Sequence, residues 1–526
     1  MISLYTNKPE YIADIADELR LFLAKEEITE AENAAADVCV TLEGSGTERH
    51  ARAQVNTGKG IAVYEWDCVI PQGADALEIK RREKHAVKIA AFRAMANVYG
   101  VMPPWGSLTG IRPTRLLREL RMRHGEAEAI RMMQQDFDVS EEKLALAKTI
   151  NAVQQPILDS QTEKDADIYI GIPFCASRCL YCSFASQVRT KKTDMAAYLA
   201  ALKKDITLGS AILKQAGRKI RAMYIGGGTP TVLTADELDG LIAHALEAYA
   251  GFDGEFTVEA GRPDTITKEK LGVLKKYGVS RLSINPQTMN DATLELIGRS
   301  HKSADIIAAF NMARDMGFDN INMDVIAGLP GEHAADMEHT LDEIIKLSPE
   351  NLTVHTLALK RSSRLVTEGE KYPMPEAEEV EHMVHMGSEA AARLGMRPYY
   401  MYRQKYMSGN LENVGYAKPG TECVYNIDMM EDTTAIMSHG AGAMTKCVYD
   451  AARRVERVPA PKEISTYIAK VGKLSGELTA ACPNIPWRSI RATRNLFAHA
   501  YGNIRIHKAR RICAAFNVAL VRGAFL

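Results

Sequence analysis

The sequence lacks several features that would place it in a specialised class of protein. No run of apolar residues approaches the ~20 residues of a membrane-spanning helix. The first 26 residues carry acidic side chains throughout and have no apolar core of the kind found in secretory signals. The net charge is −1 over 526 residues, so no overall field favours nucleic acid or an anionic membrane. We therefore expect a cytoplasmic protein with no membrane span and no nucleic-acid partner.

The cysteines do not follow the patterns of the common structural sites. The chain has nine of them, an odd number, which argues against a disulfide framework. A single Cys-x2-Cys unit occurs and no histidine lies near it, whereas structural zinc sites usually pair two such units or add histidines. Six cysteines are scattered and are interpreted as ordinary core residues: Cys39, Cys68, Cys423, Cys447, Cys482 and Cys513.

The remaining three cysteines follow a strand-like segment that ends in Gly171-Ile-Pro-Phe174. Cys175, Cys179 and Cys182 have the spacing Cys-x3-Cys-x2-Cys. Three thiolates can hold three irons of a 4Fe–4S cube and leave the fourth iron open to a chelating ligand. The amino and carboxylate groups of S-adenosylmethionine (SAM) suit that position, and an electron from the cluster would cleave a C–S bond to give a 5′-deoxyadenosyl radical. The loop therefore predicts a 4Fe–4S cluster and SAM as cofactors.

Apolar strands alternate with helix-length segments from about residue 165 to 360. The expected strands are Ile168–Ile172, Met223–Ile225, Phe256–Glu259, Arg281–Asn285, Ile321–Ile326 and Leu352–Leu359. The expected helices are Ala196–Ala216, Ala235–Tyr249, Lys268–Tyr277, Ser303–Met316 and His333–Leu347. This alternation calls for parallel strands with right-handed crossovers. Six such units predict an α/β fold built on a partial (β/α)6 barrel, with its chemistry at the carboxyl ends of the strands.

The flanking regions complete the predicted organisation: an α+β domain over 1–160, the barrel over 161–365, a further domain over 366–464 and a helical tail over 465–526. In the first domain, Val38–Leu42 and Ile61–Ile70 are expected to be strands joined by a polar turn. Arg81–Tyr99 is expected to be an amphipathic helix, and Ser140–Gln155 a helix that leads into the barrel. Residues 103–115 are rich in turn formers. Their arginines either reach an acidic substrate or, as is more usual, pair structurally.

Further motifs follow the predicted strand ends. Gly226-Gly227-Gly228-Thr229 allows close approach of the backbone to a ligand and offers N–H groups. No Gly-Lys-Ser/Thr follows, so it is not a phosphate-binding P-loop, and we interpret it as a clamp on the methionine amino group of SAM. Glu259 and Asp324 could accept hydrogen bonds from ribose hydroxyls or an ammonium, and Arg299 could pair with a carboxylate. Together with Gln287 these residues predict one cofactor pocket.

These motifs together resemble radical SAM enzymes of the oxygen-independent coproporphyrinogen III oxidase family. The resemblance rests on the cysteine loop, the glycine run, Asn285-Pro-Gln287, Ile297-Gly-Arg299 and Asp324-Val-Ile-Ala-Gly-Leu-Pro330, and it covers residues from about 165 to 447. Leu108-Thr-Gly-Ile-Arg-Pro-Thr114 and Asn410-Leu-Glu-Asn-Val-Gly-Tyr-Ala-Lys-Pro-Gly420 are similar to the HemZ branch of that family in particular.

The resemblance implies a role for individual residues. Cys175, Cys179 and Cys182 would ligate the cluster. Contacts to SAM would come from Tyr169, Tyr181, Gly227, Gly228, Thr229, Glu259, Gln287, Arg299, Asp324 and Ala358. The implied reaction is oxidative decarboxylation of two propionates of coproporphyrinogen III to vinyl groups, and it needs an electron donor to the cluster and an electron acceptor.

Two positions depart from the oxidases of the family. Phe184 stands where they have a fourth cysteine, and Gly171 where they often have histidine. The phenylalanine is shared with the HemW branch, which is associated with haem trafficking. The alternative to a decarboxylase is therefore a haem-binding or haem-trafficking protein that keeps the cluster without decarboxylase turnover.

A substrate with four carboxylates would need fixed cations near the strand ends. Arg262 follows the third expected strand, and Lys360, Arg361 and Arg364 follow the sixth. Guanidinium groups match carboxylate geometry, so we expect some of these residues to bind propionates, although a solvated run of charges would look the same in sequence.

The C-terminal segment Ile485–Tyr501 is similar to the end of a HEPN-type ribonuclease or nucleotidyltransferase-partner domain. Arg494, His499 and Tyr501 match its Arg-x4-His-x-Tyr pattern. Such a helical domain needs on the order of 100 residues to bury a core, and only the last ~40 residues share the pattern. We therefore expect a fusion remnant or a joined sequence rather than an active ribonuclease.

Overall fold

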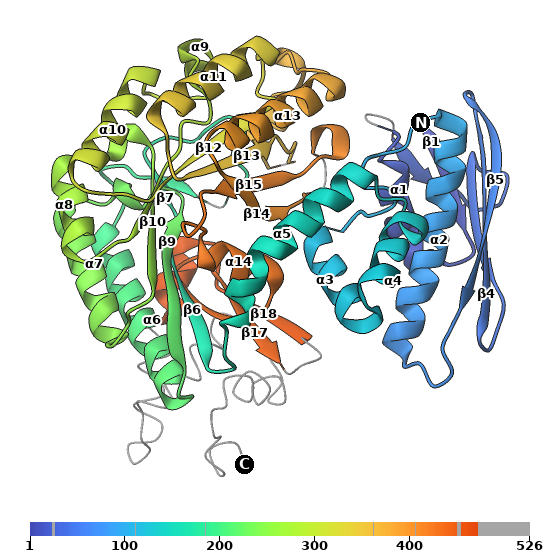
Figure 1. Cartoon of the computed structure of the whole chain (residues 1–526), viewed down its shortest axis with the longest axis horizontal. Coiled ribbons are helices and arrows are strands. Elements are labelled where there is room, and N and C mark those ends of the chain that lie inside the picture. The colour runs from blue at the N-terminus through green and yellow to red at the C-terminus, as the bar shows by residue number, and fades with distance from the viewer. Residues whose placement is uncertain are drawn as a thin grey trace. The chain divides into compact units, whose positions relative to one another are not determined.

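The computed structural model describes residues 1–23, 27–110, 112–184, 186–360, 362–404, 407–449 and 454–471. They form two compact units (Figure 1). The first comprises Met1–Thr149 with Arg403–Lys405, and the second comprises the other described residues from Ile150 onward. The division lies inside helix α5 (Glu141–Asp159), whereas the sequence placed a boundary at residue 160. The predicted tail residues Arg494, His499 and Tyr501 lie outside the described residues.

The N-terminal unit is a mixed sheet with helices on it. Its strand order is β2-β1-β3-β4-β5, with β1 parallel to β2 and β3 and the other pairs antiparallel. The strands are β1 (Ile2–Thr6), β2 (Ile28–Glu30), β3 (Val38–Glu43), β4 (Glu48–Thr57) and β5 (Gly60–Val69). Helix α2 (Ala76–Tyr99) begins at Asp75, whose side chain accepts a hydrogen bond from Glu78 N at 2.8 Å. The expected strands and helix are confirmed. The expected turn over the region of β4 is wrong, because polar residues on its exposed face hid the strand.

The turn-rich segment after α2 contributes to the core of this unit. Lys88 Nζ lies 2.8 Å from the carboxylate of Glu18 and 2.6 Å from Thr109 Oγ1, which itself donates to Glu18 at 3.1 Å. Glu18 is fully buried on helix α1 (Ile12–Leu19), and this burial raises its pKa while Lys88 lowers it. Farther along, Arg115 on helix α3 (Pro113–His124) pairs with Glu119 at 2.8 Å. These contacts are structural, which is the more usual of the two roles considered for this segment.

The second unit is built on parallel strands that alternate with helices. The six expected strands are confirmed as β6 (Asp165–Ile172), β9 (Lys219–Gly227), β10 (Glu255–Gly261), β11 (Arg281–Ile284), β12 (Ile321–Ala327) and β13 (Asn351–Thr356). They are adjacent in this order and parallel throughout. Parallel strands that follow one another in sequence order place all their carboxyl ends at one edge of the sheet. The predicted partial α/β barrel is therefore the observed fold.

Helices cover the outer side of these strands, as Figure 1 shows for α6 to α11. The expected helices are observed as α6 (Met195–Gln215), α7 (Ala235–Ala248), α8 (Lys268–Lys276), α10 (Ser303–Asp315) and α11 (Ala334–Leu347), and the short helix α9 (Asp291–Leu296) was not expected. Helix α7 begins with a capping box, in which Glu237 N donates to Thr234 Oγ1 at 3.2 Å and Thr234 N donates to the Glu237 carboxylate at 2.8 Å. Local capping signals of this kind explain why the helix starts were predictable.

The sheet extends beyond the six strands at both edges to a total of eleven. On one edge, β16 (Ala435–His439) is parallel to β6 and is followed by the antiparallel strands β17 (Met444–Tyr449) and β18 (Arg454–Pro459). On the other edge, β15 (Asn413–Ala417) and β14 (Arg397–Tyr402) pair antiparallel to β13 and to each other. Most of the region expected as a domain over 366–464 thus continues the barrel sheet, with helices α13 (Ala377–Arg393) and α14 (Val424–Glu431) between its strands.

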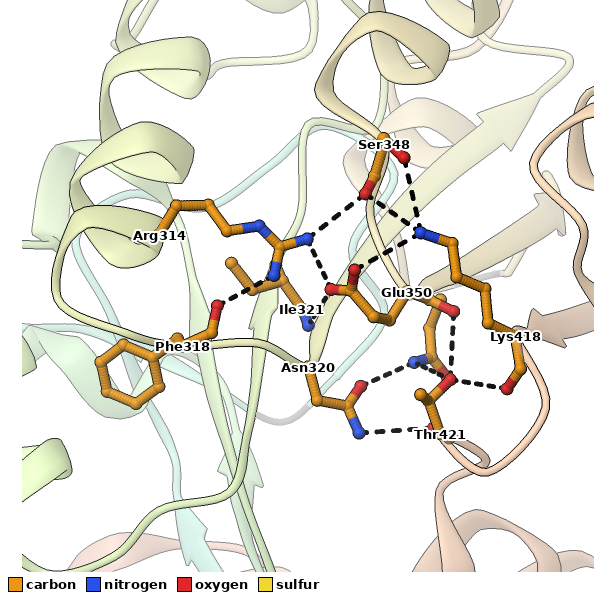
Figure 2. A network of polar contacts seen from close by, with 9 residues as sticks. Arg314, Phe318, Asn320, Ile321, Ser348, Glu350, Lys418 and Thr421 are labelled. Carbon is orange, nitrogen blue, oxygen red and sulfur yellow. Dashed lines mark hydrogen bonds and ion pairs between the residues drawn. The ribbon is translucent and has the colours of Figure 1, made fainter.

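A polar network closes the amino ends of β12 and β13 (Figure 2). Glu350 precedes β13, and its carboxylate lies 2.5 Å from Arg314 Nη2 and 3.4 Å from Lys418 Nζ. The same carboxylate accepts a hydrogen bond from Ile321 N at 3.2 Å. Lys418 N donates to Glu350 O at 2.9 Å, so the Ala417-Lys-Pro-Gly420 segment after β15 is fixed at this end of the sheet.

No helix in the described ranges is long and apolar enough to cross a membrane.

Candidate functional site

The cysteine loop leaves the sheet at the carboxyl end of β6. It contains the short strand β7 (Phe174–Cys175), which pairs with β8 (Gln187–Val188). Cys175, Cys179 and Cys182 are all half-buried free thiols. Backbone bonds hold the loop against neighbouring strand ends, because Leu180 N donates to Ile297 O at 2.9 Å and Leu365 N donates to Leu180 O at 3.0 Å. The loop is therefore fixed by the segments that follow β11 and β13.

The three thiols of this loop influence one another. Burial raises the pKa of Cys182, and the nearby Cys179 and Cys175 raise it further. Among the described residues, no three His, Cys, Asp or Glu side chains converge into a formed metal site. Ligation of a cluster by these thiols therefore stays a prediction. It rests on the spacing of the three cysteines, on their half-buried position, and on the absence of a fourth cysteine nearby in the sequence, which would leave one iron open.

Arg299 faces the cysteine loop. Its guanidinium is buried, which lowers its pKa, but the adjacent Tyr181 and Cys179 raise the pKa by more. Arg299 Nη1 also donates to Asn285 O at 2.7 Å, and its Nε has no hydrogen-bond partner. The structure thus brings together two predicted SAM contacts, Arg299 and Tyr181, with one predicted cluster ligand. A buried guanidinium with an unused donor is suited to an anionic ligand.

The glycine run at the end of β9 packs directly on the strand that precedes the cysteines. A Cβ atom on Gly228 would lie 2.5 Å from Phe174 O and 2.8 Å from Cys175 Sγ, so only glycine fits there. Gly228 N donates to Ile172 O at 2.8 Å, and Thr229 N donates to Phe174 O at 2.8 Å. The Gly227 amide donates to Glu259, and the Gly228 and Thr229 amides hold the cysteine strand, so these three N–H groups already have acceptors within the chain. A contact of the run with the methionine amino group of SAM stays a prediction. An ammonium bound there would need acceptors, which backbone carbonyl oxygens and the adjacent Glu259 carboxylate can supply.

Glu259 lies at the carboxyl end of β10 beside that run. Its carboxylate accepts hydrogen bonds from Tyr224 Oη at 2.6 Å and Gly227 N at 3.2 Å. Burial raises the pKa of Glu259 to about 7; the Tyr224 hydrogen bond opposes this shift and the charge of Asp324 adds to it. Neither hydrogen-bond partner is a cation. The carboxyl group is therefore placed to gain from a cationic ligand, which would favour its ionised form.

Asp324 and Gln287 meet on the neighbouring strands. Gln287 has a left-handed backbone (φ 69°), and its N–H donates to Asp324 O at 2.9 Å. Burial would raise the pKa of Asp324, but hydrogen bonding and the charge of His355 lower it below its usual value. His355 Nε2 lies 3.6 Å from Asp324 Oδ2, and Asn322 Nδ2 donates to Asp324 Oδ1 at 2.7 Å. Asp324 is thus ionised and partly accessible next to Glu259.

Aromatic rings lie between β6 and β9 on the inner side of the sheet. The rings of Tyr169 and Tyr224 stack at 6.3 Å between centroids, and Tyr425 from α14 stacks on Tyr224 at 4.6 Å and on Tyr169 at 6.2 Å. Tyr169 therefore lies beside Tyr224, the hydrogen-bond partner of Glu259, and its contact with SAM stays a prediction. Ala358 lies apart from these rings, after β13, in an isolated bridge with Met407.

The predicted substrate cations differ in their surroundings. Arg262 is buried and makes a two-pronged pair with Asp264 at 2.9 Å, and its Nη1 donates to Ser177 Oγ in the cysteine loop at 2.6 Å. Arg364 begins helix α12 (Arg364–Thr367) and pairs with Glu368 at 2.7 Å. Lys360 is half-buried, and desolvation lowers its pKa. Arg361 lies outside the described residues. Propionate binding by these residues stays a prediction, and the contacts of Arg262 favour a role in holding the cysteine loop.

Arg262 belongs to a group of polar residues that fixes the cysteine loop, which we call the loop clamp: Arg262, Asp264, His301 and Ser177. His301 Nδ1 lies 3.3 Å from the Asp264 carboxylate, and Ser177 Oγ donates to Gly298 O at 2.9 Å. His301 and Arg262 together lower the pKa of Asp264 far below its usual value, against the effect of burial. The clamp therefore connects the segments after β10 and β11 to the loop between Cys175 and Cys179.

Comparison with known proteins agrees with this geometry. A family model for the radical SAM superfamily matches residues 169–344. The chain is 36% identical over 454 residues to the oxygen-independent coproporphyrinogen-III oxidase-like protein HemZ of Bacillus subtilis, a match that covers 85% of this chain and 90% of that protein. The chain belongs to the oxygen-independent coproporphyrinogen-III oxidase-like family of radical SAM proteins. Membership in this family implies SAM and a 4Fe–4S cluster as cofactors.

Other members and neighbours of the family are more distant. The haem chaperone HemW of Bacillus subtilis is 33% identical over 282 residues, which cover 52% of this chain and 69% of that protein. The solved structure of coproporphyrinogen III oxidase (HemN) from Escherichia coli, described as a radical SAM enzyme, aligns with a TM-score of 0.49 at 19% identity over 69% of this chain and 93% of that one.

Sequence reasoning missed three residues that the structure places among the predicted ones. Tyr224, His355 and Tyr425 contact Glu259, Asp324 and Tyr169 respectively. Tyr224 and His355 could have been found from the sequence, because each lies on an expected strand. Side chains alternate between the two faces of a strand, and this alternation puts each of them on the same face as a predicted site residue or its pairing partner. Tyr425 comes from a helix whose position relative to the barrel is not encoded in local sequence.

Proposed function

We propose that this chain is an oxidoreductase that converts coproporphyrinogen III to protoporphyrinogen IX by oxidative decarboxylation of two propionates. The observation that carries the proposal is the match to the Bacillus subtilis relative over 90% of that protein, which extends beyond residues 169–344 into both flanking regions. A match confined to the superfamily domain would support the cofactors but not a substrate class.

The site residues suit the cofactors of this family. Cys175, Cys179 and Cys182 would hold the cluster on a loop that the Arg262–Asp264 pair fixes. Glu259 and Asp324 would accept hydrogen bonds from the polar groups of SAM. When bound, these cofactors supply a 5′-deoxyadenosyl radical, which can remove a hydrogen atom from a propionate β-carbon. The chain's own part is to orient the substrate and to keep solvent from that position.

The proposed reaction also needs redox partners. After hydrogen removal, the propionate side chain loses CO₂ and one electron to become a vinyl group. That electron must pass to an acceptor, and a separate donor must reduce the cluster, so we propose two redox partners for the protein. Lys360 and Arg364 remain the proposed cations for other propionates of the substrate.

Anaerobic turnover tests the proposal. The full chain is reconstituted with iron and sulfide and is given SAM, a reductant, coproporphyrinogen III and an electron acceptor. We expect mass spectrometry to detect two successive losses of CO₂ from the substrate together with the formation of 5′-deoxyadenosine. Formation of 5′-deoxyadenosine with no decarboxylated product would retain the radical chemistry and refute the substrate.

One observation favours a second function, haem binding without decarboxylase turnover. Phe184 occupies the position of the fourth cysteine of the oxidases, and its side chain is 71% exposed beside the cysteine loop. The haem chaperone HemW of Bacillus subtilis is similar to the chain over 282 residues. A titration with haem separates the two functions, because a stable one-to-one spectral complex in a protein that leaves coproporphyrinogen III unchanged would favour haem handling.

A further inference from the structure

The cysteine loop carries positive charges that the proposed cofactor site does not use. Residues 168–193 contain four basic side chains and no acidic one, although the whole chain has a net charge of −1. One of the four, Arg189, forms an ion pair at 2.7 Å with a glutamate of helix α7. The other three, Arg178 and the lysine pair Lys191-Lys192, are exposed. The loop that would hold the cluster therefore presents a local excess of positive charge to solvent.

Backbone contacts hold these exposed cations close to the cysteines. Arg189 N donates to Cys175 O at 2.9 Å, and the lysine pair begins two residues later. Arg178 lies between the first two cysteines, and its Nη2 donates to Ser362 O at 3.1 Å. Among the described residues, neither side chain of the lysine pair has an acidic partner. Cations of this kind on a fixed loop can attract an anionic surface from solution.

Exposed apolar side chains belong to the same loop. Phe184 is 71% exposed, and the preceding Ser183 O accepts a hydrogen bond from Ser362 Oγ at 3.5 Å. Ser362 also accepts the bond from Arg178, so one residue fixes the loop beside the phenylalanine and beside that arginine. Val188 on β8 is 41% exposed. Exposed apolar side chains next to basic ones are typical of protein–protein contact surfaces, whereas a small anion would need the cations alone.

The position of this surface favours an electron donor as the partner. The proposed reaction needs an electron at the cluster for each radical, and electron transfer weakens steeply with distance. A donor must therefore contact the chain close to the three predicted cluster ligands, which are half-buried: Cys175, Cys179 and Cys182. Complexes for electron transfer are typically small and weak, and opposite charges steer the two partners together. A carrier that is acidic around its redox group would match the positive charge of this loop.

We propose that Arg178, the lysine pair and Phe184 form a docking surface for an acidic protein that carries one electron and delivers it to the cluster. The reduced carrier loses one electron and the cluster gains it, and no proton or other group is transferred. This inference rests on the proposed function, because that function needs a reduced cluster. It adds the chemical nature of the donor and the place where the donor binds.

A binding measurement without turnover tests this surface. An acidic flavodoxin is titrated anaerobically into the reconstituted full chain at low and at high ionic strength, and calorimetry measures the affinity. We expect the double variant Lys191→Glu with Lys192→Glu to weaken binding about tenfold at low ionic strength and to lose most of the salt dependence. Phe184→Ser should also weaken binding about tenfold but keep the salt dependence.

The reduction of the cluster gives a second measurement on the same variants. Visible absorbance follows this reduction, which should be slower than in the wild type when the reduced flavodoxin is the donor. Reduction by reduced methyl viologen, a small cation that needs no docking surface, should not become slower. The iron content of both variants should equal that of the wild type.

The matched control is Lys214→Glu with Lys219→Glu, which changes the net charge equally at the end of α6 and the start of β9, at the opposite end of the strands. It should leave the affinity for flavodoxin unchanged. Wild-type affinity in the loop variants, or no binding by the wild type at low ionic strength, would overturn the docking surface. Heparin binding as tight as flavodoxin binding, with no effect of Phe184→Ser on either, would indicate a general anion site and overturn it too.

Failure of the proposed function gives a different result. A wild-type chain that binds flavodoxin through this surface, and is reduced by it, but leaves coproporphyrinogen III unchanged would support the docking surface and refute the substrate. A chain that decarboxylates coproporphyrinogen III with a chemical reductant but does not bind flavodoxin would support the function and refute the docking surface.

Discussion

Three half-buried carboxylates, one at the amino ends of the barrel strands and two at the carboxyl ends, differ in the partners that they face. At the amino ends, Glu350 faces the permanent cations Arg314 and Lys418 (Figure 2). At the carboxyl ends, Glu259 faces a tyrosine hydroxyl and a backbone amide, and Asp324 faces an asparagine and a histidine. A carboxylate that is paired with a permanent cation is already stabilised in its ionised form. A carboxylate with neutral or titratable partners can still be stabilised by a cationic ligand. We infer that Glu259 and Asp324, unlike Glu350, are available to a cationic ligand.

The same contrast applies to glutamates within one strand. Glu255 at the start of β10 accepts bonds from Val424 N at 2.9 Å and Tyr425 N at 3.3 Å, so it caps the first turn of α14. Glu259 at the end of β10 has its raised pKa of about 7. Two glutamates four residues apart on one inner face therefore have separate roles, one structural and one available to a ligand.

The largest effect is expected from the cysteine loop. Cys179→Ala should prevent assembly of the cluster, because two thiolates cannot hold a site that needs three. Iron content, the visible absorbance of the cluster and SAM cleavage should all be lost. The control is Cys39→Ala, which changes a half-buried thiol on β3. An iron content in Cys179→Ala equal to that of the wild type would show that the cluster is held elsewhere.

The next effect concerns the clamp on that loop. Arg262→Met should lower the free energy of unfolding by about 2 kcal/mol, because the buried guanidinium makes a two-pronged charged hydrogen bond to Asp264, which would keep only its contact with His301. The loop would also lose its bond to Ser177, so the cluster should be released faster on exposure to a chelator. Arg364→Met removes an exposed pair and should leave the unfolding free energy essentially unchanged. Denaturant unfolding and iron release measure both quantities. Wild-type stability in Arg262→Met, with weaker tetrapyrrole binding, would instead support the role that sequence suggested for this residue.

These two predictions also show what the sequence could and could not provide. The six strands were predictable because each is a short segment rich in apolar residues and followed by a turn, as in Ile321–Ala327, where Asn322 and Asp324 are the only polar residues. The contacts of Arg262 could not be predicted. Arg262 contacts Ser177 directly and His301 through Asp264, and only the order of strands in the sheet brings these residues together. The use of the Gly228 and Thr229 amides was hidden for the same reason, since their acceptors lie on β6 and β7. Sequence identified residue types suited to the chemistry, and long-range pairing decided which of them are free for it.

A smaller effect is expected from pH. Glu259 must be ionised to attract a cationic group of SAM, and its pKa of about 7 means that the ionised fraction rises steeply from pH 6 to 8. We expect SAM affinity to rise over this range by up to about tenfold per pH unit below the pKa. The profile should be flat in Glu259→Gln, which keeps the shape of the side chain and cannot ionise.

The raised pKa of Glu259 also determines the direction in which the free energy of unfolding changes with pH. Its pKa in the folded chain is raised above that of an unfolded glutamate, so the native state binds the proton more tightly. The free energy of unfolding should therefore fall as the pH rises from about 4 to about 7 and then level off, and Glu259→Gln should remove that part of the decline. An affinity for SAM that does not change between pH 6 and 8 in the wild type would contradict the proposed contact.

The smallest effect is expected at the closed end of the barrel. Lys418 is partly exposed, and its Nζ lies 3.4 Å from the Glu350 carboxylate, so Lys418→Met should lower the free energy of unfolding by no more than about 1 kcal/mol. Glu350→Gln should have a larger effect, because it weakens the pair with Arg314 at 2.5 Å and the bond from Ile321 N together. Neither change should alter SAM affinity or tetrapyrrole binding, which calorimetry and fluorescence titration would measure. A loss of SAM affinity in Lys418→Met would mean that the amino ends of the strands are coupled to the site, and that the separation between a structural and a functional end is incomplete.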